Sequence, residues 1–175
     1  MKNQRILFYL MSLLMAASLM TFTACDGDDD DDPSDDDDQE MLVGVQGKWQ
    51  SSGSNVAPLL VLLVDTDSIY AEFKTDMTYV VENYDKSGAL VVFEGTYTQT
   101  ITPGQSIAEI TINQSTPSVG TSVGIFEVTG NTMKYEVVQT VPDFMQIPPT
   151  VAGGFGSTNM GANMMDNVQT FVRIE

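Results

Sequence analysis

The chain has 175 residues, with 24 acidic and 7 basic side chains, one cysteine and a formal net charge of −17. It contains no histidine, which excludes imidazole catalysis and histidine-ligated metal sites. So few basic side chains cannot neutralise a phosphate backbone, so we expect no nucleic-acid partner.

Residues 1–24 have the layout of a secretory signal peptide. Lys2 and Arg5 provide a positive start, and residues 6–20 form an almost unbroken apolar run. A membrane-spanning helix needs roughly 20 apolar residues, whereas this run is shorter and is followed by acidic residues. We therefore expect the segment to be cleaved off rather than to stay as a membrane anchor.

Cys25 is the only cysteine, so it cannot form an internal disulfide. The small residues Thr23 and Ala24 before it resemble the lipobox of bacterial lipoproteins, with Phe22 where that family prefers leucine. The resemblance implies cleavage before Cys25, a diacylglycerol on its sulfur and a further acyl chain, such as palmitate, on the new N-terminus. Several acyl chains hold a protein stably at a membrane where one is marginal. The membrane is thus an expected partner through Cys25.

Residues 25–40 form an acidic tether with eleven acidic side chains and no basic one. Such a segment cannot bury enough apolar surface to fold, and we expect a disordered, self-repelling spacer. It lacks the sixth-position glycine of an EF-hand loop, so no metal site is expected. Residues 34–38 resemble the surface-export signal of lipoproteins from Bacteroidota-type Gram-negative bacteria. That resemblance implies the outer membrane, lipid-anchored and facing the cell surface; a periplasm-facing lipoprotein is the alternative.

Residues 41–175 are long enough for one domain with its own core. Short runs of Val, Ile, Thr, Tyr and Phe alternate with Gly, Asn, Asp and Pro, which predicts an all-β, antiparallel fold. Alternation is clearest in the seventh run, where Met133 and Tyr135 share one face and Lys134 and Glu136 the other. Sequential hairpin turns favour an eight-stranded up-and-down barrel. The predicted strands are 47–52, 67–74, 77–84, 89–101, 106–113, 123–128, 132–140 and 168–174.

Two segments interrupt this pattern. Residues 56–64 are continuously apolar, which predicts a short helix or buried flap at the barrel mouth, with a strand as the alternative. Residues 141–167 are too long for an ordinary connection and too apolar for a solvated linker. We expect an ordered lid or flap there.

Gly47 and Trp49 on the first predicted strand, together with Arg173 on the last, resemble the lipocalin family and its bacterial lipocalin-like relatives. The resemblance covers residues 42–175. It implies that Trp49 closes one end of the barrel and that Arg173 packs across its ring, a contact of about 0.5–2 kcal/mol.

The residue types present argue against an enzyme. There is no nucleophile–histidine pair, Cys25 is assigned to lipid, and the acids of the domain mostly fall at turns or on the polar face, where they are expected to be solvated. No cofactor motif is present, because the glycines at 153–156 lack the lysine and strand-to-helix context of a phosphate loop.

An eight-stranded barrel can hold one small ligand or be packed solid. Solid packing is the commoner arrangement, and the sequence leaves both open. The first hypothesis is a small apolar ligand in the barrel, with 56–64 and 141–167 gating the mouth. The alternative is a solid barrel that binds a protein partner through its Met-, Gly- and Pro-rich loop. The candidate ligand-binding residues are Tyr79, Phe93, Tyr97, Met133, Tyr135, Phe144 and Phe155.

Overall fold

The computed structural model describes residues 42–158 and 167–174. The signal peptide, Cys25, the acidic tether and residues 159–166 lie outside the described residues, so the predictions on them stay predictions. Within those two ranges, no helix combines the length and apolar character that spanning a membrane requires.

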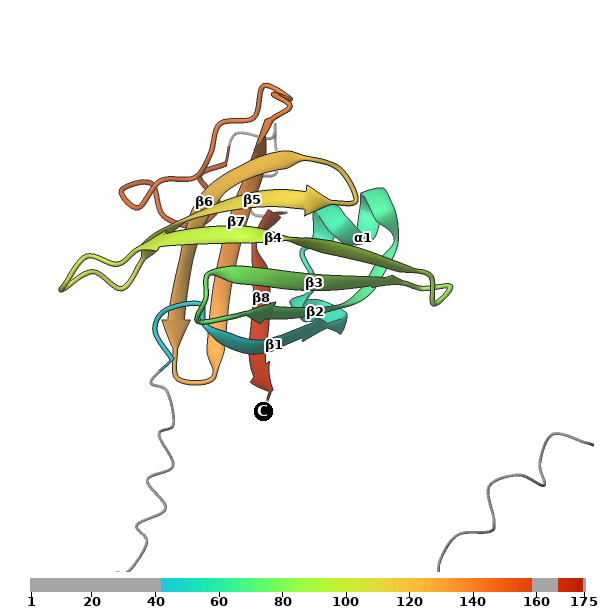
Figure 1. Ribbon diagram of the computed structural model, residues 1–175, viewed down its shortest axis with the longest axis horizontal. Helices are drawn as coiled ribbons and strands as arrows, with labels where there is room; N and C mark the ends of the chain where they lie inside the picture. Colours follow the sequence, from blue (N-terminus) through green and yellow to red (C-terminus); the bar gives the residue numbers. More distant parts are fainter. Residues whose placement is uncertain (1–41, 159–166, 175) are drawn as a thin grey trace, which may run out of the picture. The chain divides into compact units, whose positions relative to one another are not determined.

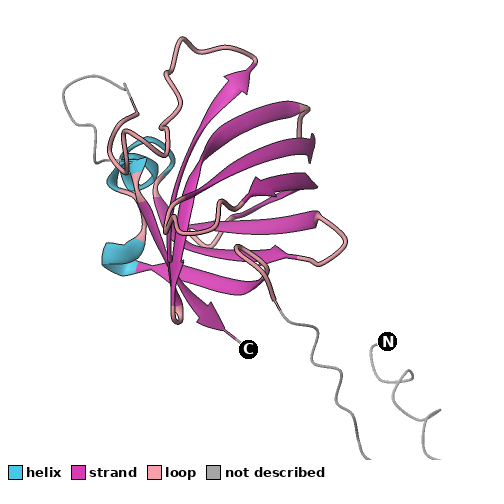
Figure 2. Ribbon diagram, turned by 90° about the vertical axis from the view of Figure 1, so that its left-hand side faces the viewer, coloured by secondary structure: helices cyan, strands magenta, loops and turns pink. Residues whose placement is uncertain are grey.

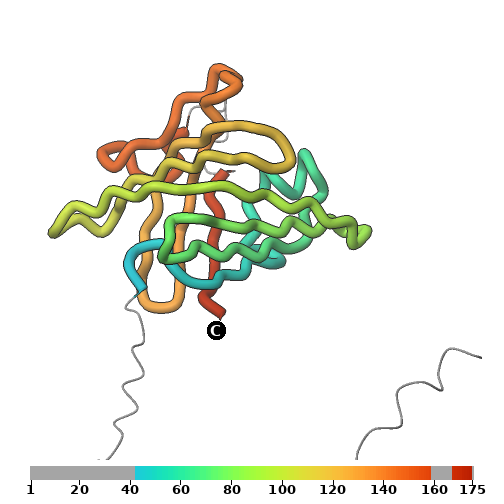
Figure 3. Tube along the Cα trace, in the orientation of Figure 1, coloured from blue at the N-terminus to red at the C-terminus, as the bar shows by residue number. Residues whose placement is uncertain are grey.

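Eight antiparallel strands form one closed barrel, in which each strand pairs with the next and β8 pairs with β1. The chain runs up and down from strand to strand (Figures 1 and 3), which confirms the predicted all-β barrel and its order. The strands are β1 (Gly47–Ser52), β2 (Thr66–Phe73), β3 (Thr78–Asp85), β4 (Leu90–Thr100), β5 (Ala108–Thr116), β6 (Gly120–Thr129), β7 (Thr132–Val141) and β8 (Gln169–Ile174).

The barrel interior is a contiguous apolar core built from alternate residues of the strands. The same alternation sends the intervening polar side chains outward. All strand pairings and the core cluster fall within 42–174, and the described residues of this range form one compact unit. This part of the chain therefore has a hydrophobic core of its own, and we expect it to fold without the residues before it.

The apolar run after β1 is helical, as expected. A 3₁₀ turn, η1 (Gly53–Asn55), leads into α1 (Pro58–Val64), and both lie beside the strands in Figure 2. Proline at the first position suits a helix start because its missing N–H has no partner there. The helix ends at Asp65, whose φ of 54° is left-handed.

Gln169 of β8 holds the start of this helical segment against the barrel. Its side-chain oxygen accepts a hydrogen bond of 2.8 Å from the backbone N–H of Ala57, and its amide donates to the hydroxyl of Ser51. Leu60 packs against the core, whereas Leu62 is 79% exposed. In α1, Leu60 therefore contacts the barrel interior, whereas Leu62 faces solvent.

The segment after β7 does not form the expected lid over the mouth in its described part. It folds back along the outer wall, because the outward-facing carboxylate of Glu136 accepts a hydrogen bond of 2.7 Å from the N–H of Gly156 and further bonds from the N–H and hydroxyl of Thr158. Glu136 and Thr158 are both fully buried. The expectation that Glu136 is solvated is therefore wrong, although its outward direction is as the alternation predicts.

Candidate functional site

The end of the barrel where β1 begins is closed by Trp49. Its side chain is fully buried, and its indole N–H donates to the carbonyl of Val45 over 2.7 Å. The guanidinium carbon of Arg173 lies 4.1 Å from the centre of the Trp49 ring, and Nη1 of Arg173 donates to the carbonyl of Gln46 over 2.9 Å. The expected contact between Trp49 and Arg173 is present. Burial lowers the pKa of Arg173.

Gly47 makes room for that arginine. Its φ is +116°, and a Cβ built there would lie 2.2 Å from Nη1 of Arg173. Any larger residue would combine an unfavourable backbone conformation with a clash. The glycine, tryptophan and arginine therefore form one closing unit.

Two of the candidate ligand-binding residues belong to the core outside the cavity. Tyr97 is 1% exposed and donates its hydroxyl to the carbonyl of Lys74 over 2.7 Å. Met133 is fully buried in the same core cluster. The prediction that these two residues line a ligand cavity is wrong, because both are covered by other core side chains.

A cavity of about 250 Å³ lies in the part of the barrel nearer α1. Engineered apolar cavities of about 150 Å³ accept benzene, whereas drug-sized ligands occupy about 300–1,000 Å³. The barrel is therefore not packed solid along its length, and the space suits a small molecule. Its described walls are formed by Leu60, Ile69, Ala71, Phe73, Tyr79, Val81, Asn83, Phe93, Ile112, Gln114, Ser122, Tyr135, Val137, Asn167, Gln169 and Phe171.

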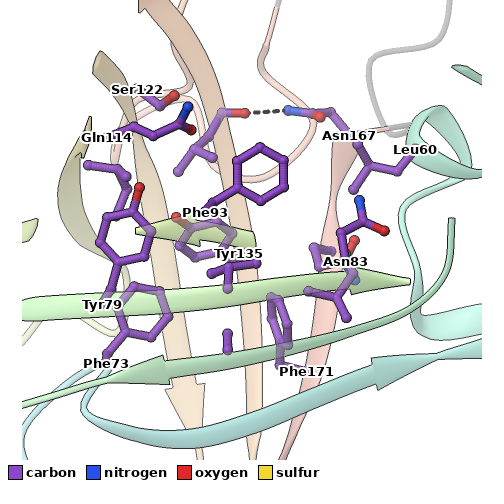
Figure 4. A pocket seen from close by; sticks show the side chains of 16 residues that line it. Leu60, Phe73, Tyr79, Asn83, Phe93, Gln114, Ser122, Tyr135, Asn167 and Phe171 are labelled. Carbon is purple, nitrogen blue, oxygen red and sulfur yellow. Dashed lines mark hydrogen bonds between the residues drawn. The ribbon is translucent and has the colours of Figure 1, made fainter. Parts of the chain in front are cut away.

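One part of the cavity wall is aromatic. The ring of Phe73 lies 6.1 Å from that of Tyr79 and 6.2 Å from that of Tyr135, between ring centres, and Tyr135 contacts Phe171 edge-on at 6.0 Å. Such ring pairs contribute stability beyond their buried area. Figure 4 shows these four rings grouped together, with Phe93 nearby.

Uncharged polar side chains surround the opposite part of the cavity (Figure 4), and the described lining includes no charged residue. Three of them are held by the chain itself. Gln114 donates to the carbonyl of Ser118 over 2.8 Å, and Asn167 donates to that of Val137 over 2.8 Å. Gln169 is fixed by its bonds to Ala57, just before α1, and to Ser51 of β1. These amides therefore form a polar rim of fixed geometry.

Burial affects the two tyrosines of the wall. Tyr79 is 3% exposed, and desolvation raises the pKa of its phenol to about 12. Desolvation also raises the pKa of Tyr135, with a smaller contribution from the neighbouring Tyr79. Both phenols are therefore neutral hydroxyl donors near pH 7.

Of the seven candidate ligand-binding residues, Tyr79, Phe93 and Tyr135 line the cavity. Phe144 is 60% exposed. Phe155 lies on the outer face of the barrel, where Nζ of Lys134 is 5.9 Å from its ring centre. Neither residue lines the cavity, so the predictions for Phe144 and Phe155 are wrong: Phe144 is exposed to solvent, and Phe155 lies outside the barrel.

Sequence reasoning missed Phe73, Phe171 and the polar rim. A signal for the rim was present: Asn83 follows Tyr79 and Val81 at a spacing of two, so it is a polar residue on an inward-facing apolar row. Gln114 follows Ile110 and Ile112 in the same way. A polar residue at an inward position marks either a strand end or a cavity.

In the described ranges, no three acidic side chains come close enough to hold a metal ion. No family model matches the chain, and no curated protein or solved structure is significantly similar to it. What the barrel does is therefore argued from its cavity.

Proposed function

We propose that the protein is a non-enzymatic binding protein that takes up a small, largely apolar ligand in its barrel. The observation that carries the proposal is the cavity of about 250 Å³, with its aromatic wall and uncharged rim. Cavities of this make-up, apolar with a few placed polar groups, are typical of small-molecule sites. The closing unit of Gly47, Trp49 and Arg173 supports membership of a lipocalin-like family.

We further propose that the mature chain begins at an acylated Cys25 and is held at the outer membrane, at the cell surface, by that lipid. The sequence from the signal peptide to the acidic tether supports this part of the proposal. Growth of the host with an alkyne-tagged palmitate tests it. The full-length chain should carry the tag and its Cys25→Ser variant should not; equal labelling of the two would contradict lipidation at this residue.

Native mass spectrometry of residues 39–175, purified from the host without detergent, tests the binding function. We expect an excess mass that denaturation releases as a small molecule, or uptake of one from a host lipid extract. A Val81→Trp variant fills the cavity and should lose this uptake. Val80→Trp, which places the same ring on the outward face of β3, should keep it. An unliganded protein that takes up nothing from the extract would contradict the proposal.

The segment after β7 supports a second candidate function, binding of a protein partner. Its tip exposes three apolar side chains: Phe144 is 60%, Met145 91% and Ile147 56% exposed. Flexible methionine side chains suit adaptable contacts. A double variant, Phe144→Ser with Met145→Ser, leaves the Glu136 anchor intact and should abolish cross-linking to a partner in intact cells. Val119→Ser, at a residue 80% exposed elsewhere, should not. Unchanged cross-linking in the double variant would contradict this function.

A further inference from the structure

The hydroxyls of Tyr79 and Tyr135 differ from those of the other described tyrosines. Those of Tyr70, Tyr84 and Tyr97 each take part in a hydrogen bond with another residue. Within the described part of the chain, the hydroxyls of Tyr79 and Tyr135 take part in none. Neither hydroxyl is sealed from water, because among the described residues only Thr66 Oγ1 is a buried side-chain polar atom without a partner. Both hydroxyls are therefore free to bind water or a ligand, and a ligand that covered them without accepting a hydrogen bond would cost free energy.

Both hydroxyls belong to the cavity. The two side chains line it, and Figure 4 shows Tyr79 and Tyr135 side by side below Gln114. The two phenols are also close enough for Tyr79 to contribute to the raised pKa of Tyr135. Two neutral donors therefore stand together within an otherwise aromatic wall, whereas the rim amides Gln114 and Asn167 already donate to backbone carbonyls.

The charge of the site limits what these donors can hold. The described lining contains no lysine or arginine that would pair with an anion. An anion buried without a partner is expensive, so a fatty acid or another carboxylate would be disfavoured.

We infer that the ligand of this cavity is an uncharged, largely apolar molecule with an oxygen acceptor that binds the hydroxyls of Tyr79 and Tyr135. The aromatic wall around Phe73 and Phe171 encloses its apolar body. A carbonyl, ether or alcohol oxygen meets the chemistry of the site, and a hydrocarbon would leave both hydroxyls unsatisfied. This inference rests on the proposed function and specifies its ligand class.

Three probes of nearly equal shape separate these possibilities: 2-acetylnaphthalene carries a neutral acceptor, 2-isopropylnaphthalene carries none, and 2-naphthoate carries a charge. Calorimetric titration of residues 39–175 at pH 7 should rank the acetyl compound first. Tyr79→Phe and Tyr135→Phe should each weaken its binding about two- to tenfold, the range expected for one neutral hydrogen bond, and leave binding of the isopropyl compound unchanged. Tyr84→Phe, on the outer face, is the matched control.

The possible outcomes test the ligand class separately from the proposed small-molecule binding function. If naphthoate binds as tightly as the acetyl compound, or if both phenylalanine variants bind the acetyl compound like wild type, the inference is overturned and the binding function stands. If the folded wild-type barrel binds none of the three probes, both are overturned. Thermal unfolding of each variant checks that the barrel has folded.

Discussion

Arg173 and Trp49 lie on the neighbouring strands β8 and β1 and face each other directly in the register, with the guanidinium over the indole ring. The arginine also donates to the carbonyl of Gln46, so it links the ring to the chain segment that enters the barrel. Arg173 thus connects β8, the Trp49 ring that closes the barrel end, and the segment that enters β1.

Replacing this arginine should destabilise the barrel. Arg173→Lys keeps the charge but cannot both cover the ring and reach Gln46, because a lysine offers one compact ammonium instead of a planar fork. We expect a loss of about 1–3 kcal/mol in the free energy of unfolding, from the cation–π contact and the hydrogen bond together. Urea unfolding measures it. Lys134→Met, which removes a cation 5.9 Å from the ring of Phe155, is the comparison and should change little.

Gly47→Ala should destabilise the protein through two effects, a positive φ and a clash with Arg173. Gly88→Ala separates them, because Gly88 has a φ of +84° but nothing within 4 Å of its added Cβ. We expect the free energy of unfolding to fall by about 1 kcal/mol at Gly88, from the backbone effect alone, and by more at Gly47. Equal losses in urea unfolding at the two positions would show that the arginine moves aside without cost.

Glu136→Gln should release the outer segment and leave the barrel closed. An amide offers one acceptor where the carboxylate oxygens accept from Gly156 and Thr158, and its NH₂ would face a donor. Removing hydrogen bonds to a buried charged group costs about 1.5–3 kcal/mol each. Hydrogen exchange should increase in 150–158 and stay unchanged in β2 to β4. Glu109→Gln, at an exposed acid, is the control, and protection of 150–158 in both variants would contradict the anchoring role.

Stability should fall at high pH because of the buried phenols. Tyrosine ionises near pH 10 in an unfolded chain, whereas burial raises the pKa of Tyr79 to about 12 in the folded protein. Between these values the unfolded state loses a proton that the folded state keeps, so the free energy of unfolding decreases as pH rises from 10 to 12. Below pH 10 the phenol is neutral in both states, so the free energy of unfolding does not change through this group.

Tyr79→Phe should flatten this decline by up to about 1.4 kcal/mol per pH unit, the contribution of one proton. Urea unfolding at pH 8, 10 and 11.5 measures the slope. Phe93→Leu alters the same cavity without removing a titratable group, and it should leave the slope unchanged. Identical slopes for wild type and Tyr79→Phe would contradict the assignment of the decline to this phenol.

The order of the strands could be predicted because it follows from local sequence patterns. Alternation with a period of two and turn residues at hairpin distance specify an antiparallel meander without reference to distant residues. The β6 strand begins at Gly120, three residues before its predicted start at 123, because pairing with both β5 and β7 extends into a polar stretch. The pairing of Trp49 with Arg173 was found through resemblance, since no local pattern connects residues so far apart.

The cavity could be predicted only in part. Alternation identifies Tyr79, Phe93 and Tyr135 as inward-facing, but it places Tyr97 and Met133 on the same side. Whether inward side chains touch one another or leave a space depends on barrel curvature and on what covers each end, and neither is a property of a single strand.

The sequence by itself determined the barrel, its strand order and the inward direction of most apolar side chains, because these follow from short-range periodicity. Only the tertiary structure decided that the cavity lies nearer α1, that Glu136 is buried and that Gly156 and Thr158 lie against the outer wall. Each of these depends on contacts between segments distant in the chain. A carboxylate such as Glu136 looks like a solvated surface group until the segment that donates hydrogen bonds to it has folded over it.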